Sequence, residues 1–568
     1  MIFVPVASPS TSVSTTFGGV FDVAASEQRL AAIETELSRP NAWDNPEALP
    51  PLLREKRQLE DEVSRLNALK TCHDDMHEWL ERWNKAGDSM FDPEWLEWYG
   101  KNVHELILML DSWGMEFEKD AQGRFKRKPG RGHREAVVFP GYKMQKKLRG
   151  ILEKLGVVIV DRVMITELLT SDGHVAGATG FNVRTGQFYV FEAKNTVLST
   201  GACSFKGQYH GQDMVSGEGN DMALRVGAEF TNMEFANTYN ATAKDFDICG
   251  MSRFQCLGGR FTNALGETFM HKYDPVQGEG AMLHILVRAM TQEVRAGRGP
   301  ISFDLRGMSE EDKDLSRRML PMFFEACASK GVDPFSEPVE WIPGFMGSTS
   351  CGAGLTLKSF SCDTTIPGLF AAGETAGGNP NKFVGGCCAE GKLAARGAIA
   401  YMKDLELPPL DMAAVEQEKA RVYAPLLARD EDGVRPVEMK ERLQRLMDEY
   451  AGGVSQFYRT NEERLDYALK HIAMLQSQFG YLRARDLHEL MQAHETMDRV
   501  DVAEAVVHHL KARKETRWAG WQTRSDYPER DDANFDCFIE SRRDPATGKV
   551  ETFTRPYEQL IPGDRYTA

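Results

Sequence analysis

The chain has 568 residues and a formal net charge of −16, with 42% hydrophobic and 27% charged residues. This composition is typical of a globular protein of several domains. The acidic balance argues against nucleic acid as the main partner, because phosphate binding needs clustered Lys and Arg, yet it is compatible with a local basic pocket for an anionic substrate.

The ten cysteines form no C-x-x-C pair, so the spaced ligands of a zinc site or an iron–sulfur cluster are missing. We therefore expect reduced thiols and no bound metal. No apolar run approaches the roughly 18 residues that a bilayer span requires. Residues 1–7 are also too short for the apolar core of a signal peptide. These features predict a cytoplasmic protein with no membrane span.

The first part of the chain has helical periodicity. Residues 1–20 are rich in Ser and Thr, which predicts a disordered tail. Between residues 21 and 75, apolar side chains recur at helical spacing in two stretches separated by Pro40. The polar faces are dense in charged residues, so we expect a helical hairpin that needs packing to be stable.

The middle of the chain changes from a helical to a β-like pattern. An aromatic-rich run from Trp95 to Trp113 predicts a helix, and the apolar run at residues 157–160 predicts a buried strand. Residues 166–181 predict a β-hairpin around an Asp172-Gly173 turn, which residues 188–191 continue.

The second half alternates between sheet and helix signals. Residues 281–295 and 384–403 read as helices, and residues 365–373 as a strand between them. Helical patterns dominate from residue 411 to about 513. The remaining residues, 518–568, are rich in aromatic, charged and turn-forming residues and are interpreted as a C-terminal tail.

Two junctions, at each of which a predicted strand ends in glycine, are the candidate cofactor-binding sites. A strand at residues 195–200 ends in Gly201, and open α/β sheets bind ligands at this carboxyl edge, although many ordinary turns also contain glycine. The second junction, Pro367 to Glu374, is more specific. Gly373 lets a ligand approach the backbone, and the Glu374 carboxylate can accept hydrogen bonds from sugar or ribityl hydroxyls.

A helix follows the second junction after a glycine-rich turn. Its N-terminus presents free N–H groups and a positive dipole end, which would stabilise the negative edge of a reduced flavin. The alternative is an ordinary strand–loop–helix unit. Cys387 and Cys388 lie at this helix start. We expect them to pack against a flavin, and the alternative is a redox role, because a helix N-terminus lowers the pKa of a thiol.

The stretch Gly368-Leu-Phe-Ala-Ala-Gly-Glu374, with Asn381-Lys-Phe-Val-Gly-Gly386 behind it, resembles the closing FAD segment of the succinate dehydrogenase/fumarate reductase flavoprotein superfamily. Within it, the adenylyl-sulfate reductase alpha (flavoprotein) subunit is the most similar, also over Ala296–Ile301 and Glu515–Trp521. The resemblance runs from about residue 95 to the C-terminus. It implies FAD as cofactor, bound by Gly201, Gly217, Gly219, Gly373, Glu374, Asn381, Phe383, Val384 and Gly385.

The chain departs from the superfamily pattern in two places. No G-x-G-x-x-G turn for the FAD pyrophosphate precedes residue 95, so the first βαβ unit is missing. Residues 345–351 lack the His that fumarate reductases place there. As catalytic candidates, Arg288 and Lys382 would hold a small anionic substrate against the flavin. The alternative for both is a solvated charge or a structural ion pair.

The implied fold class is α/β (α+β overall), with a Rossmann-like FAD-binding domain in discontinuous segments. The expected parts are a tail (1–20), a helical hairpin (21–75), a partial FAD-binding domain (85–240), an inserted capping domain (241–342), the closing FAD segment (343–405), a helical domain (406–515) and a C-terminal tail (516–568).

The hairpin resembles a second family. Phe17–Asp22, Leu37–Pro40, Trp43 and Lys56–Leu59 are similar to the N-terminal helical domain of bacterial peptide chain release factor 2. The Gly-Gly-Gln motif of release factors is absent from the chain, so we expect no peptide-release activity.

These features predict an FAD-dependent oxidoreductase, a reductase flavoprotein subunit resembling adenylyl-sulfate reductase and fumarate reductase. A two-electron reduction would act on a sulfur compound or an unsaturated dicarboxylate. Electrons would come from a separate iron–sulfur subunit, because this chain has no cluster motif. The alternative is a non-catalytic remnant or fusion protein with an incomplete FAD site.

Overall fold

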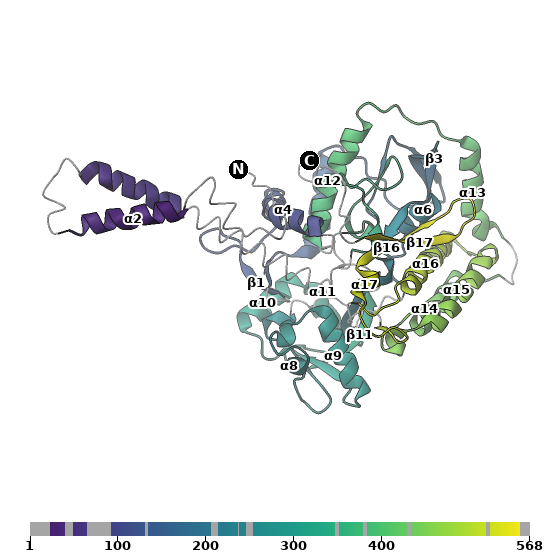
Figure 1. Ribbon diagram of the computed structural model, residues 1–568. Coiled ribbons are helices and arrows are strands. Elements are labelled where there is room, and N and C mark those ends of the chain that lie inside the picture. The colour runs from purple at the N-terminus through teal and green to yellow at the C-terminus, as the bar shows by residue number, and fades with distance from the viewer. Residues whose placement is uncertain are drawn as a thin grey trace. The chain divides into compact units, whose positions relative to one another are not determined.

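The chain forms two compact units, Met1–Trp83 and Asn84–Ala568 (Figure 1). The first contains a pair of helices, and the second contains all of the sheets that the structure describes. The computed structural model describes residues 23–39, 49–64, 93–130, 134–205, 214–236, 238–245, 254–346, 352–378, 383–428, 433–517 and 523–556.

In the first unit, helix α2 (Val23–Leu37) is joined by ion pairs to a second helix over residues 49–64. Arg29 Nε lies 2.7 Å from Glu55 Oε1, and Lys56 Nζ lies 3.2 Å from Glu34 Oε1. The side chains are exposed, so these pairs contribute little stability. Ile33, on the predicted apolar face, is fully buried. The predicted pairing of two helices is therefore confirmed.

A three-stranded antiparallel sheet, β3–β4–β5, confirms the predicted hairpin and its continuation. Its strands are β3 (Val163–Ser171), β4 (His174–Asn182) and β5 (Phe188–Glu192). Ser171 pairs with His174, which leaves Asp172 (φ 49°) and Gly173 (φ 76°) as a two-residue turn. Positive φ at both positions matches the right-handed twist of the flanking strands, so the Asp-Gly pair fixes the register.

The prediction of a buried strand at residues 157–160 is wrong. This stretch has no regular structure between α5 (Met144–Lys154) and β3, and Val158 is 84% exposed. An apolar run becomes a strand only when another strand supplies hydrogen-bonding partners. None of the described strands pairs with residues 157–160.

The candidate cofactor sheet consists of β6 (Thr196–Leu198) and β13 (Leu369–Ala371), which pair in parallel with Thr196 opposite Leu369. A parallel pair needs a long connection, and here it consists of residues 199–368. Helix α12 (Val384–Met402) packs against both strands. The predicted strand and helix at residues 365–373 and 384–403 are confirmed, and the strand ends of both junctions lie at the same sheet edge.

The chain between these strands builds a second sheet in the antiparallel order β8–β11–β10–β9. Its core is aromatic, with Phe261 stacked on Phe303 (ring centroids 4.2 Å apart) and Trp341 edge-on to Phe303. The elements of this region are β8 (Thr238–Ala243), β9 (Arg260–Thr262), α8 (Met270–Tyr273), α9 (Leu283–Arg295), β10 (Ile301–Asp304), α10 (Glu310–Met319), α11 (Pro321–Ser329) and β11 (Val339–Met346).

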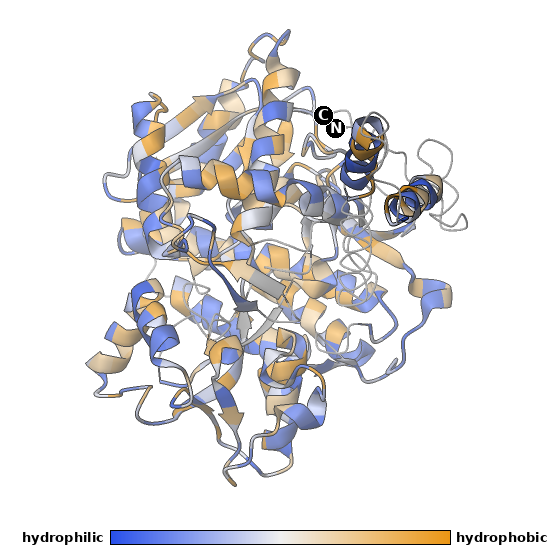
Figure 2. Ribbon diagram, turned by 90° about the vertical axis from the view of Figure 1, so that its left-hand side faces the viewer, coloured by the Kyte–Doolittle hydropathy of each residue, from blue (hydrophilic) through white to orange (hydrophobic). Residues whose placement is uncertain are grey.

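The predicted helical region after residue 411 is confirmed as α13 (Met412–Leu427), α14 (Pro436–Tyr450), α15 (Glu462–Ser477) and α16 (Leu487–Ala512). Figure 2 shows hydrophilic and hydrophobic residues interspersed along the helices that face the viewer. None of the described helices combines the length and apolar character that crossing a bilayer requires.

The segment after residue 516, interpreted from the sequence as a tail, contains regular secondary structure. Strand β16 (Cys537–Arg543) lies inside the sheet β12–β7–β16–β17. Arg517 is almost completely buried, and its guanidinium pairs with Glu515 (Nε–Oε1 2.6 Å). Arg517 of this segment and Glu515 therefore form an internal ion pair. The other members of the sheet are β7 (Glu229–Thr231), β12 (Gly354–Leu355) and β17 (Val550–Pro556).

The remaining described elements are α4 (Pro93–Ser112), which confirms the predicted aromatic-rich helix, β1 (Arg127–Gly130), β2 (Arg134–Val137), α6 (Glu218–Arg225), β14 (Arg459–Thr460), β15 (Thr523–Arg524) and α17 (Asp532–Phe535).

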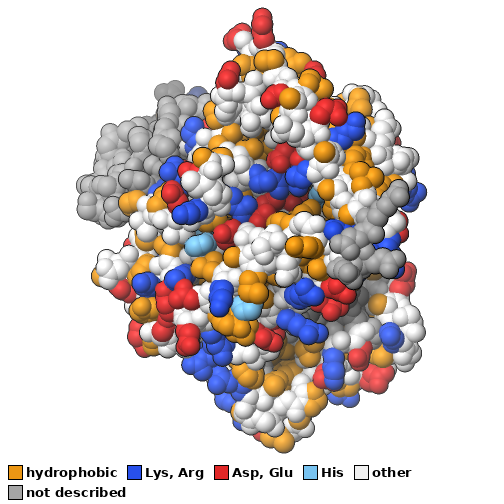
Figure 3. All heavy atoms as spheres, turned by 90° about the vertical axis from the view of Figure 1, so that its right-hand side faces the viewer, with side chains coloured by type: hydrophobic (Ala, Val, Ile, Leu, Met, Phe, Trp, Pro, Cys, Tyr) orange, Lys and Arg blue, Asp and Glu red, His pale blue; other side chains and the backbone are white. Residues whose placement is uncertain are grey.

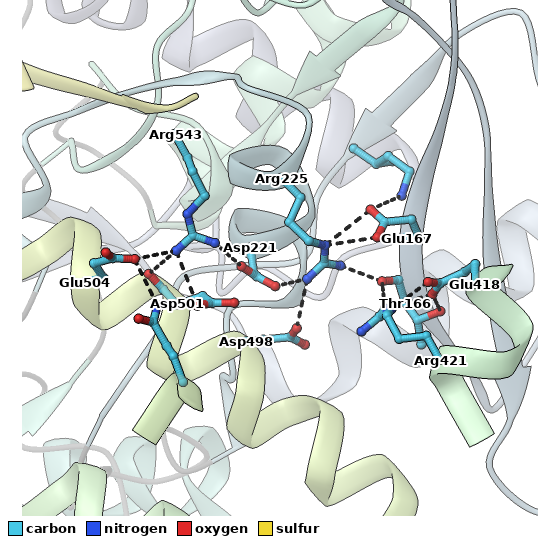
Figure 4. A network of polar contacts seen from close by, with 12 residues as sticks. Thr166, Glu167, Asp221, Arg225, Glu418, Arg421, Asp498, Asp501, Glu504 and Arg543 are labelled. Carbon is cyan, nitrogen blue, oxygen red and sulfur yellow. Dashed lines mark hydrogen bonds and ion pairs between the residues drawn. The ribbon is translucent and has the colours of Figure 1, made fainter. Parts of the chain in front are cut away.

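A buried charge network connects α6 to three distant segments (Figure 4). Arg225 forms ion pairs with Asp221 of the same helix and with Glu167 of β3 (Nε–Oε2 3.0 Å). It also lies 3.7 Å from Asp498 of α16. Asp221 is fully buried, so this arginine balances a carboxylate that water does not reach.

Arg543 of β16 forms the second centre of the network. Its guanidinium lies 2.8 Å from Glu504 Oε2, 3.3 Å from Asp501 Oδ1 and 3.8 Å from Asp221 Oδ1. Because Asp221 faces both arginines, the two centres form one network. Helix α6 is thereby held to the C-terminal helix α16 and to the last sheet.

More carboxylates than cations are buried here, and this raises carboxyl pKa values. Burial and the nearby Asp221 charge raise the pKa of Asp501 to about 6, despite the opposing attraction of Arg543. The same two causes raise the pKa of Asp498 well above its usual range. Protons are therefore bound more tightly at these sites in the folded protein than in the unfolded chain, whose aspartates titrate near 3.9.

We expect Asp501→Asn to alter the pH dependence of stability. Because the folded pKa is raised, the contribution of Asp501 to stability is complete below pH 4 and is lost as pH rises through about 6. The free energy of unfolding of the wild type, minus that of the variant, should fall by up to about 3 kcal/mol between pH 4 and pH 7. Urea unfolding across this range measures it. A flat difference for Asp501→Asn would contradict the assignment.

Candidate flavin site

The two candidate junctions are joined by hydrogen bonds. Gly201 follows β6 with φ 84°, and Gly373 follows β13 with φ 74° in the short helix η7 (Gly373–Thr375). The buried Thr375 hydroxyl donates to the Gly201 carbonyl (3.0 Å) and lies 3.3 Å from the Thr200 hydroxyl. Both backbones turn in conformations that favour glycine, at one edge of the parallel sheet.

Glu390 fixes the second turn, and the sequence analysis did not identify it. This fully buried carboxylate in α12 accepts a hydrogen bond from the Gly373 N–H (2.7 Å). Sequence offers one signal, since Glu390 is the only acidic residue in α12 and lies among small residues. The bond connects the strand end to the helix that covers it.

Helix α12 begins close to the Gly373 turn. Phe383 is its N-cap residue, and the Phe383 side chain makes no capping hydrogen bond to the first turn, which begins with Val384 and Gly385. Gly385 is approached closely by the Tyr99 ring of α4, so a side chain at this position would collide with that ring. Uncapped N–H groups and the helix dipole favour a negatively charged ligand edge here.

A second helix begins at the same sheet edge. Gly217 (φ 82°) is the N-cap of α6, again without a side-chain cap. A side chain at Gly219 would overlap the Thr200 side chain. The lack of a side chain therefore allows α6 to begin against the end of β6, beside the Gly201 turn.

The remaining candidates are less central. Glu374 is half-buried in η7. Arg288 is exposed on α9, a helix that packs against β8 and β11. Asn381 and Lys382 lie outside the described residues. Cys387 Sγ would be 3.5 Å from a side chain at Gly373, so this cysteine faces the turn, whereas burial raises the pKa of the Cys388 thiol.

The residues present fit the flavin end of FAD. The site combines two positive-φ glycines, a long helix with an uncapped N-terminus and a second uncapped helix start at one edge of a parallel sheet. The chain contains no G-x-G-x-x-G sequence, so the usual binding turn for the pyrophosphate of FAD is not found.

Comparison with known proteins agrees with this geometry. The FAD binding domain family matches residues 63–388, and the fumarate reductase flavoprotein C-terminal family matches residues 440–560. The chain belongs to the FAD binding domain family. It is an FAD-dependent reductase flavoprotein related to adenylylsulfate reductase and fumarate reductase, and its cofactor is FAD.

Individual relatives of this family cover most of the chain. Adenylylsulfate reductase subunit alpha of Megalodesulfovibrio gigas is 25% identical over 480 residues, which is 72% of each chain. The structure of adenylylsulfate reductase from Archaeoglobus fulgidus superimposes with a TM-score of 0.74 at 27% identity over 86% of each chain. An adenosine-5-phosphosulfate reductase in complex with sulfite, as a covalent adduct, has a TM-score of 0.73 at 28% identity, again over 86% of each chain.

We expect Gly373→Ala to weaken FAD binding about tenfold or more, because a left-handed conformation costs a residue with a side chain roughly 1–2 kcal/mol. Gly391→Ala in α12 is the matched control, since a side chain there meets no atom within 4 Å. It should keep its flavin and gain up to about 1 kcal/mol of stability. Flavin absorbance per chain and urea unfolding measure both effects. Full flavin retention at low FAD concentration in Gly373→Ala would contradict the site.

Proposed function

We propose that this chain is the flavoprotein subunit of a reductase that passes two electrons to a small anionic substrate. The observation that supports this most is the meeting of the Gly201 and Gly373 turns beside the uncapped N-terminus of α12. FAD bound there would supply the two-electron chemistry. Gly217, Gly219, Glu374, Asn381, Phe383, Val384 and Gly385 complete the proposed cofactor contacts.

The proposed substrate is a sulfur oxyanion compound of the adenylylsulfate class. Two of the similar proteins are reductases of such a compound by name, and one was solved with sulfite. An unsaturated dicarboxylate is less favoured, because residues 345–351 contain no His. Lys382 and Arg288 are proposed to bind the anion, and the adjacent helix N-terminus adds positive potential.

The proposed electron donor is a separate iron–sulfur subunit, because the chain has no C-x-x-C sequence to hold a cluster of its own. We also propose the domain boundaries given above, with residues 241–342 as a capping domain over the flavin. The helical hairpin of the first unit is proposed to be a fused segment of release-factor type without peptide-release activity.

One observation favours an alternative, a non-catalytic remnant with a weak FAD site. The missing G-x-G-x-x-G sequence removes the usual pyrophosphate contacts, and the first βαβ unit is proposed to be absent. The two proposals differ in a simple property. A reductase requires flavin to bind tightly and to be reducible, whereas a remnant requires neither.

We expect the purified full-length chain to be yellow, with close to one FAD per chain after incubation with excess FAD and gel filtration. Reduced methyl viologen should then support turnover of adenylylsulfate to sulfite and AMP, measured by dye oxidation. Fumarate serves as the comparison substrate. A colourless protein that takes up no added FAD would overturn the proposal and leave the remnant, whereas fumarate as the faster substrate would overturn only the substrate class.

We expect Lys382→Ala and Arg288→Ala each to lower kcat/KM for the anionic substrate about 10- to 100-fold, because a hydrogen bond between charged groups contributes roughly 1.5–3 kcal/mol. The effect should be mainly on KM if the residues only bind the anion. Arg396→Ala, an exposed arginine of α12, is the control and should leave kcat/KM unchanged. A variant with wild-type kcat/KM would remove that residue from the site.

A further inference from the structure

An apolar patch is exposed at the end of helix α5 and in the loop that follows it. Large apolar residues in a stretch of nine positions are exposed to solvent, with Leu155 at 73% and Val158 at 84%. Isolated apolar residues on a surface need no explanation, but a clustered group of this kind marks an interaction site. The patch consists of Leu152, Leu155, Val157, Val158 and Val160.

The patch lies in a basic stretch of the sequence, although the chain as a whole is acidic. Residues 113–162 contain thirteen Lys or Arg and six Asp or Glu, whereas the full chain has 68 and 84. Arg149 is neutralised by Asp161 (Nη2–Oδ2 2.9 Å). Lys146 and Lys154 are exposed and form no ion pair with any residue that the structure describes. Both signs of charge are interspersed on the face in Figure 3.

The inner face of α5 is close to the candidate flavin site. Met144 and Leu148 pack in the same cluster as Val384 and Cys388 from the first turns of α12. An α-helix is about 10–12 Å across with its side chains. A protein bound to the outer face of α5 would therefore be separated from the N-terminus of α12 by this helix and by the apolar cluster of Leu110, Met115 and Phe117 against which both helices pack.

We propose that the outer face of α5 and the loop at residues 155–160 form a docking surface for an acidic electron-donor protein. The proposal rests on the function proposed above, because only a flavin that needs an external donor requires such a partner. The surface has the anatomy of a protein interface, with an apolar centre and a charged rim. The positive rim steers an acidic carrier toward the patch, and contact with the apolar centre holds it there.

Charge complementarity favours an acidic protein over a second copy of the chain or a nucleic acid as the partner at this surface. A second copy of the chain would bring two rims of the same positive sign together, which is repulsive in a twofold contact. A nucleic acid would match the rim, but its phosphates would cover the apolar centre without a favourable contact. An acidic protein with an apolar contact region satisfies both parts of the surface.

The test uses the full-length chain and a small acidic ferredoxin as the probe. Association is measured by stopped-flow flavin reduction with the reduced ferredoxin, at 20 mM and 300 mM salt. Lys146→Glu/Lys154→Glu should lower the association rate constant about tenfold or more at low salt, and the difference should shrink at high salt. Val158→Asp should raise the dissociation rate constant about tenfold by placing a carboxylate in the apolar centre. Lys330→Glu, an exposed lysine elsewhere, is the matched control.

The two proposals fail in different ways. Loss of turnover with reduced methyl viologen, which needs no docking surface, would contradict the proposed function alone. If methyl viologen turnover is intact but both variants accept electrons from ferredoxin like the wild type, the docking surface is wrong. A change of oligomeric state in Val158→Asp by light scattering, without a change in ferredoxin kinetics, would also overturn it and assign the face to self-association.

Discussion

The position of helix α6 depends on a buried charge network with two arginine centres. Arg225 and Arg543 lie on either side of Asp221, a carboxylate with no solvent exposure, and each also pairs with carboxylates from elsewhere in the chain. Buried charges are unfavourable when unpaired, and removing one partner of a buried pair typically costs 3–5 kcal/mol, so each charge constrains where the others lie. The network is therefore more important for specifying the arrangement than for adding net stability.

This arrangement positions the candidate site. Gly217 and Gly219 begin the helix that carries Asp221 and Arg225, so the segments that hold the arginines also set where Gly219 lies against Thr200 and Gly217 against Cys203. On the other side of the sheet edge, Glu390 holds the Gly373 turn. A ligand at this edge would meet backbone that charged side chains hold in place from two directions, and such a site needs little rearrangement on binding.

The features that sequence predicted correctly are local. Asp172-Gly173 determines its hairpin because the turn chemistry acts within four residues, and the helix at residues 281–295 follows from its own periodicity. The errors are non-local. The apolar run at residues 157–160 was predicted as a strand, but its state depends on whether a partner strand exists. Arg517 and β16 looked like parts of a tail because burial of an arginine depends on a partner such as Glu515.

The same distinction holds within the site. The glycine turns after β6 and β13 were predictable because each glycine follows its strand within a few residues. The contacts that join them were not predictable, since Thr375 to Gly201 and Glu390 to Gly373 depend on the folded arrangement. Small side chains and single acidic residues are common in helices, and nothing in their spacing shows which of them will face a strand end.

The parallel pairing of β6 with β13 also has a kinetic consequence. Residues 199–368 lie between the two strands, and contacts of such long sequence separation form late, because the entropy of closing the loop opposes the pairing. The sheet edge that carries Gly201 and Gly373 therefore cannot form in a chain that has not yet been synthesised through β13, or in an early intermediate. A bound flavin would report that folding is complete, and by binding only the folded state it would lower the population of unfolded molecules throughout the unit.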